Sequence, residues 1–74
     1  MTTSTDHVPE VVDLTSRELA VLHLLVEGCT ALAMAHRLGI SVRTVQKHLE
    51  HVYEKLGVET RSAAVAIAIR VIEQ

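Results

Sequence analysis

Aromatic side chains are almost absent from this chain of 74 residues, which contains one Tyr and no Trp or Phe. A core must therefore be built from Leu, Val, Ile, Ala and Met. Alternating strand patterns and hairpin dipeptides such as Asn-Gly are also missing, and their absence predicts an all-helical fold. The length allows one small domain. Because a core of this size is marginal by itself, association with another chain would help to stabilise it.

Cysteine is equally scarce, since Cys29 is the only one, and this excludes an intramolecular disulfide and a cysteine-only metal site. His48 and His51 are three residues apart, but a structural zinc site needs four ligands, so we expect no metal and no other cofactor. A redox sensor would need a reactive thiol and a resolving partner, and neither is visible. Paired carboxylates and a Gly-rich phosphate loop are missing too, which predicts that the protein is not an enzyme.

Long apolar runs are also lacking. No uninterrupted apolar stretch is long enough to span a membrane, and residues 1–10 contain no signal-peptide core. We therefore expect a soluble, cytoplasmic protein with no membrane partner. Residues 1–12 are polar and Thr-rich and include the only Pro. This composition predicts a flexible N-terminal tail ahead of one domain over residues 13–74.

The charges are distributed unevenly along the chain, although the formal net charge is only −2. Residues 1–28 contain five acidic residues and one basic residue. Residues 36–56 contain four basic residues, two acidic residues and three of the histidines. The distribution of charge matters more than the net charge for binding nucleic acid. Segment 36–56 is therefore the candidate for this contact, although its excess of basic over acidic residues is small.

Capping residues and glycines predict where four helices begin and end. Thr15 and Glu18 form the pattern of a capping box, with Leu14 and Leu19 as a flanking apolar pair, and Gly28 ends this first helix. Its expected apolar face contains Leu19, Leu22, Leu25 and Val26. Further helices are expected over residues 31–38 after Thr30, 42–56 after Ser41, and 61–73 after Thr60.

The segment from Ala31 to Val52 has the layout of a helix-turn-helix. Small Ala35 lies where two helices must approach closely, and Gly39 lies where the turn needs a left-handed residue. Leu38, Ile40 and Val45 are apolar at the spacing that closes a small core behind this turn. The inward face of the second helix is expected to contain Val45, Leu49, Val52 and Leu56. Such a unit presents its second helix to the DNA major groove.

The last expected helix is apolar on nearly all sides. A helical wheel places Ala64, Val65, Ala68 and Ile72 on one side, which can pack on the core. Ala63, Ala66 and Ile67 lie on the other side, interrupted by Arg70. An apolar surface of this kind often binds a partner, which predicts a homodimer through this helix. The alternative is an Ala-rich terminal helix without a partner, because Ala is a strong helix former.

Four motifs agree in order and spacing with a known family. They are LTSRE at residues 14–18, VLHLLVEG at 21–28, ISVRTVQKH at 40–48 and YEKLGVETR at 53–61, followed by Ala64 and Ala68. Together they resemble the LuxR-type helix-turn-helix domain, also called GerE or FixJ/NarL-type. The resemblance covers about residues 13–72. It implies a bacterial four-helix domain that binds DNA through residues 42–56 and dimerises through its last helix.

The chain departs from the usual pattern of that family at several positions. The start of the second helix, usually polar, reads Thr30, Ala31, Leu32 and Ala33. Gln46 stands where a basic residue is common, and Glu50 where a basic or polar residue is frequent. Each change removes or opposes attraction to the DNA backbone, so strong binding by the isolated domain does not follow.

The candidate DNA contacts fall into two groups. Residues in the first turns of helix 42–56, and Glu50 one turn further, are candidates for contact with base edges. Among the candidates for phosphate contact, Thr30 and Thr44 could cap helices instead, and Arg61 could form an internal salt bridge instead. Glu50 could accept from cytosine, repel phosphates or pair with Lys47. The base-edge candidates are Arg43, Gln46, Lys47 and Glu50; the phosphate candidates are Thr30, Thr44, Arg37, His51, Lys55 and Arg61. The dimer candidates are Ala63, Ala66, Ile67 and Arg70.

The function predicted is that of a bacterial transcriptional regulator, or its output domain, that binds duplex DNA as a homodimer. RNA polymerase and an upstream receiver or sensor domain are further expected partners. The alternative is a protein-interaction module on the same fold, using the apolar residues 31–34 and the last helix. A third class, a metal or redox sensor, would require stoichiometric metal or a reactive Cys29.

Overall fold

The computed structural model describes residues 13–72, and this part of the chain contains four α-helices and no strand. They are α1 (Ser16–Val26), α2 (Ala31–Leu38), α3 (Val42–Leu56) and α4 (Arg61–Ile72). The predicted all-helical, four-helix fold is therefore confirmed, with helix bounds within about a residue or two of those expected. The predicted tail over residues 1–12 and the predicted end of the last helix at Glu73 lie outside the described residues.

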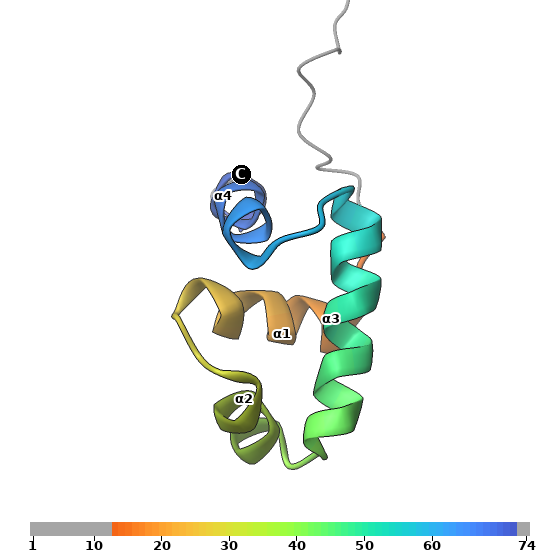
Figure 1. Cartoon of the computed structure of the whole chain (residues 1–74), viewed down its shortest axis with the longest axis vertical. Helices are drawn as coiled ribbons and strands as arrows, with labels where there is room; N and C mark the ends of the chain where they lie inside the picture. The colour runs from red at the N-terminus through yellow and green to blue at the C-terminus, as the bar shows by residue number, and fades with distance from the viewer. Residues whose placement is uncertain (1–12, 73–74) are drawn as a thin grey trace, which may run out of the picture.

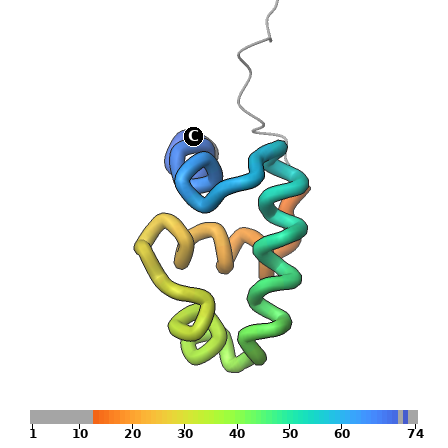
Figure 2. Tube along the Cα trace, viewed as in Figure 1, coloured from red at the N-terminus to blue at the C-terminus, as the bar shows by residue number. Residues whose placement is uncertain are grey.

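Helix α1 occupies the centre of the domain (Figure 1). It packs against α3 and α4, while α2 packs against α3. In the view of Figure 1, α2 and α4 lie on opposite sides of α1, and α3 runs along the side of the domain. The trace in Figure 2 shows the tight turn that joins α2 to α3 and the longer connection from α3 to α4. Helix α3 therefore keeps one long face turned outward.

The helix ends form as their capping residues predict. Thr15 Oγ1 accepts from the N–H of Glu18 at 3.1 Å, and Glu18 Oε1 accepts from the N–H of Thr15 at 3.1 Å, which completes the capping box. The other expected caps also accept from the N–H three residues on; they are Thr30, Ser41 and Thr60. Gly39 has φ of +68° at the end of α2, as the tight turn requires.

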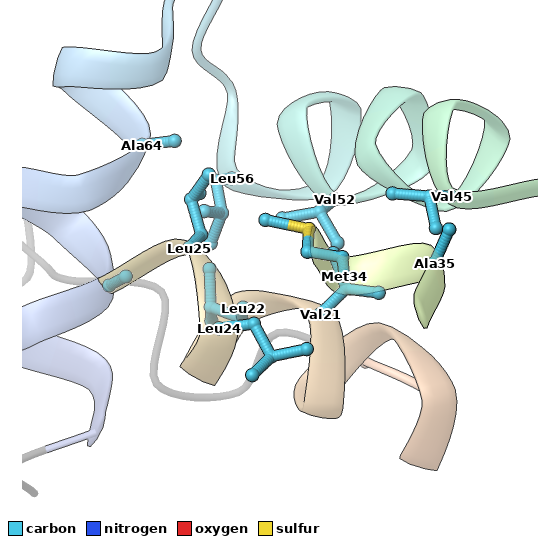
Figure 3. Close-up of a cluster of buried hydrophobic side chains, with 11 residues drawn as sticks. Val21, Leu22, Leu24, Leu25, Met34, Ala35, Val45, Val52, Leu56 and Ala64 are labelled. Carbon is cyan, nitrogen blue, oxygen red and sulfur yellow. The ribbon is translucent and has the colours of Figure 1, made fainter. Parts of the chain in front are cut away.

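The core is a single aliphatic cluster between the four helices (Figure 3). The predicted inward face of α3 is confirmed, since Val45, Val52 and Leu56 are buried and Leu49 packs against the cluster half-buried. The prediction for α1 was wrong at Leu19, which is 40% exposed. The face of α1 that is buried contains Val21, Leu22, Leu24 and Leu25. Two helices, α3 and α4, pack on α1, so the buried face is wider than one apolar stripe.

Helix α4 buries its small residues most deeply. Ala64 and Ala68 are fully buried, as the helical wheel predicted. Ile67, which the wheel placed on the opposite side, is half-buried against the core, whereas Ile69 is 39% exposed. Within residues 13–72, no helix has the length and apolar character needed to cross a membrane.

Candidate nucleic-acid interface

The outward face of α3 carries a stripe of four exposed polar side chains. They follow the helical spacing i, i+3, i+4, i+7, so they share one face. Together they line an open depression, named here the polar depression; its residues are Arg43, Gln46, Lys47 and Glu50. These are the four residues that the sequence predicted for base edges, and the structure brings all four together.

The charged groups of the polar depression have no internal partner among the described residues. No ion pair with an N–O distance within 4 Å involves Arg43, Lys47 or Glu50 across residues 13–72. Within the described residues, the side chains of Arg43 and Lys47 therefore present donor groups that form no ion pair, and the carboxylate of Glu50 in the same depression lies beyond ion-pair distance from them. Groups in this state can bind an external ligand without first breaking a contact in the domain.

Two hydroxyl side chains lie at the starts of α2 and α3. Thr30 caps α2 through the N–H of Ala33 at 3.0 Å. Thr44 Oγ1 lies 2.9 Å from Ser41 Oγ, which itself accepts from the N–H of Thr44. Both threonines are exposed. They serve the local backbone and still present a hydroxyl group beside a helix start, where N–H groups attract anions.

A buried carboxylate joins α1 to the second half of α3. Glu18 is only 4% exposed, and its Oε1 accepts from Lys55 Nζ at 2.7 Å. Lys55 Nζ also donates to the backbone oxygen of Asp13 at 2.7 Å. Glu18 Oε2 lies 3.7 Å from His51 Nδ1. Two residues predicted for phosphate contact, Lys55 and His51, thus face a carboxylate inside the domain.

The hydrogen bond from Lys55 holds the pKa of Glu18 below its ordinary value. Burial opposes this effect because it disfavours the charged form. The N–H of Thr15, the positive charge of Lys55 and the neighbouring imidazole of His51 add to the lowering. The carboxylate is therefore ionised at neutral pH, and the ion pair with Lys55 is the principal polar contact between α1 and α3.

Two arginines predicted for phosphate contact are held near the connection between α1 and α2. Arg37 Nη1 donates to Glu27 Oε1 at 2.9 Å, and the same group lies 3.7 Å from Cys29 Sγ. Arg61 Nη2 donates to the backbone oxygen of Cys29 at 2.5 Å. Arg61 therefore ties α4 to this connection through a backbone carbonyl, which differs from the internal salt bridge that the sequence offered as the alternative to phosphate contact.

The ion pair of Glu18 with Lys55 was not predicted from the sequence. The capping box identified Glu18 as an N-terminal residue of α1, but its cationic partner is 37 residues further along the chain. A buried acid within an apolar face was the available sign, because a buried carboxylate needs a partner. Among residues 13–72, no group of three or more His, Cys, Asp or Glu side chains is arranged to hold a metal ion.

Comparison with known proteins assigns the family of this fold. Residues 12–68 match the family described as bacterial regulatory proteins, luxR family. The chain belongs to the luxR family. Its predicted resemblance is thereby confirmed, and the relatives of this luxR-family domain are named as regulators of transcription rather than as enzymes.

Relatives of the domain are longer proteins. Over 58 residues the chain is 47% identical to the probable transcriptional regulatory protein SgaR of Hyphomicrobium methylovorum, covering 78% of this chain and 28% of that protein. It is 42% identical over 57 residues to the transcriptional regulatory protein YdfI of Bacillus subtilis, covering 77% and 27%. The crystal structure of the response regulator ChrA of a heme-sensing two-component system matches with a TM-score of 0.74 and 42% identity, covering 77% and 28%. The chain thus spans little more than a quarter of these relatives.

Proposed function

We propose that this domain binds duplex DNA for a bacterial transcriptional regulator, with α3 in the major groove. The observation that carries the proposal is the polar depression, where Arg43 and Lys47 are exposed and no described residue pairs with them. Because bacterial DNA lies in the cytoplasm, we expect the protein to act there. The alternative, a protein-interaction module, is favoured by one observation: Leu32, at the start of α2, is 69% exposed.

The dimensions of α3 suit the groove. A helix with its side chains is about 10–12 Å wide, and the major groove is about 12 Å wide. The seven helical steps from Arg43 to Glu50 rise about 10 Å along the helix, which corresponds to about three base-pair steps. Arg43 and Lys47 suit guanine O6 and N7, and Gln46 suits adenine N6 and N7. We assign these side chains, with Glu50, to base edges.

The phosphate contacts are assigned to the remaining candidates in two ranks. Thr30 and Thr44 present exposed hydroxyl groups beside helix starts, and each of them also takes part in a local hydrogen bond. Arg37, Lys55 and Arg61 would have to share or leave the acceptors that they hold in the domain. His51 lies beside Glu18 and is half exposed. The phosphate affinity of the free domain is therefore expected to be modest.

A salt titration of DNA binding tests both the function and this division of the cations. We count each cation at the DNA surface as displacing one counterion. If only Arg43 and Lys47 of both protomers act, the slope of log affinity against log salt is about −4. If Arg37, Lys55 and Arg61 also transfer to DNA, it is about −9. The measurement is fluorescence anisotropy with mixed-sequence duplexes at several salt concentrations.

Lys47→Ala makes the assignment specific to α3. We expect about a tenfold loss of affinity for a duplex selected with the native protein. Arg17→Ala, which removes an exposed cation of α1, is the matched control and should have little effect. Protein that is helical by circular dichroism but binds no duplex at low salt would contradict the proposal. That result favours the interaction module, whose partner would cover Leu32.

We further propose that two copies of the domain join through α4. Ala66 and Arg70 are exposed on this helix, Ala63 and Ile67 are half-buried, and Ile69 adds an exposed apolar side chain. Small residues allow two helices to approach closely. A dimer would place two copies of α3 in successive major grooves about one DNA turn apart.

Ala66→Glu tests this interface. The exposed position tolerates a larger side chain, so the fold is retained, while a carboxylate in an apolar helix contact raises the dimer dissociation constant by about tenfold or more. Sedimentation equilibrium measures this constant. Ser16→Glu adds the same charge at the exposed start of α1 and should leave it unchanged. Equal dissociation constants for Ala66→Glu and the native protein would rule out α4 as the contact.

Longer relatives suggest what the domain is attached to. The chain spans 28% of ChrA, which is a response regulator. We therefore propose that this domain serves as the output part of a regulator with an upstream receiver or sensor domain, and that RNA polymerase is its partner at the promoter. The exposed Leu32 of α2 would be available for such protein contacts.

A further inference from the structure

Glu50 is an acid on the face that the proposed function turns toward DNA. It is exposed, it lines the polar depression with Lys47, and no described residue lies within ion-pair distance of its carboxylate. A negative charge at this place opposes attraction to phosphates. It also stands four residues before Glu54, a like-charge spacing that weakens a helix slightly. Neither the fold nor general DNA affinity explains this residue.

We infer that Glu50 determines base specificity by selecting cytosine and excluding guanine and thymine, at a cost in general DNA affinity. This inference rests on the proposed function of α3. An ionised carboxylate can only accept hydrogen bonds. Cytosine presents the N4 amino donor in the major groove, whereas guanine presents two acceptors and thymine presents an acceptor and a methyl group. Two acceptors facing each other repel, so the carboxylate discriminates against guanine and thymine.

The neighbours of Glu50 make the selection directional. Arg43 and Lys47 can only donate, and they occupy the part of the polar depression nearer the start of α3. The three helical steps from Lys47 to Glu50 rise about 4.5 Å along the helix, and base pairs are stacked about 3.4 Å apart. The arrangement therefore favours a half-site in which guanine faces Arg43 or Lys47 and cytosine faces Glu50 at a neighbouring position.

Adenine is the closest competitor of cytosine at this position. Its N6 amino group is a donor, but N7 beside it is an acceptor that faces the second carboxylate oxygen. Glutamine in place of Glu50 would satisfy both atoms of adenine, because its amide offers one acceptor and one donor group. The substitution Glu50→Gln should therefore change the preferred base from cytosine to adenine.

Glu50→Gln and Glu54→Gln form a matched pair for the test. Both remove one exposed carboxylate from α3, but Glu54 does not line the polar depression. Duplexes are selected from a random pool with the native protein and with each variant, and affinities are measured for the selected duplex and for random duplex. For Glu50→Gln we expect the affinity for random duplex to rise several-fold. For the duplex selected by the native protein, the ratio of specific to random affinity should fall about tenfold. Glu54→Gln should leave this ratio and the selected sequence unchanged.

The outcomes separate this inference from the function on which it rests. The inference is supported if Glu50→Gln loses the preference for cytosine while Glu54→Gln keeps it. If the native protein selects a specific duplex and Glu50→Gln selects the same bases, the role of Glu50 is overturned. The proposed DNA-binding function is unaffected by that result. A folded native protein that binds no duplex at low salt overturns the proposed function and this inference with it.

Discussion

Replacing Leu22 with alanine is expected to lower the free energy of unfolding by about 3–5 kcal/mol. Leu22 is fully buried at the centre of the cluster in Figure 3, where α1 meets the other helices. The removed methyl groups lose their burial, and the space left behind is only partly refilled. A domain of about 60 ordered residues has a total stability of only about 3–9 kcal/mol. The substitution would therefore remove a large share of the total stability of the domain.

Urea denaturation followed by circular dichroism measures this loss. Leu32→Ala is the matched control, because it is the same change at a side chain that is 69% exposed. Its effect should stay within about 0.5 kcal/mol. Equal losses for the two variants would contradict the placement of Leu22 in the core and of Leu32 at the surface.

Replacing Lys55 with methionine is expected to cost about 2–4 kcal/mol at neutral pH. Methionine keeps most of the apolar stem but leaves the buried carboxylate of Glu18 without its cation. The estimate lies below that for a fully buried pair, because the side chain of Lys55 is 34% exposed. Lys47→Met makes the same change at an exposed position of α3 that forms no ion pair within residues 13–72, and it should cost much less.

The pH dependence identifies the carboxylate responsible. Because folding lowers the pKa of Glu18, its contribution to stability is complete above the ordinary pKa of a glutamate. This contribution is lost as the pH falls through the pKa of the folded state. The difference between native protein and Lys55→Met should therefore shrink in acid. Urea midpoints measured from neutral pH down to about pH 3 test this, and a constant difference would exclude the Glu18 pair as its source.

Local signals were sufficient to predict the helices. Thr15, Thr30, Ser41 and Thr60 each cap a helix through a hydrogen bond to a residue three positions away. Gly39 and Gly57 end helices in the left-handed region. Interactions over so few residues are encoded in short stretches of sequence, so the pattern of caps, apolar spacing and glycines determines the boundaries. The polar stripe of α3 follows from the same periodicity.

Contacts between distant segments could not be read in this way. Leu19 was misplaced because the apolar spacing of α1 does not show where the neighbouring helices lie. Ile67 was misplaced although it follows the buried Ala64 by three residues, a spacing that puts both on nearly the same face of α4. The pairs of Lys55 with Glu18 and of Arg61 with Cys29 join residues 37 and 32 positions apart. No spacing rule links such residues. The sequence therefore identified the cations of the candidate site, but it did not show which of them form hydrogen bonds or ion pairs inside the domain.

The contact between Lys55 and the backbone of Asp13 has a consequence for protein engineering. It brings the first described residue to the far end of α3, about 18 Å along the helix from Arg43. Figure 1 shows α4 at this same end and the α2–α3 turn at the opposite one. A fluorescent reporter or an unrelated input module fused ahead of Asp13 would be held away from the polar depression. Modules of different kinds can therefore be attached at this end of α3 without covering its outward face.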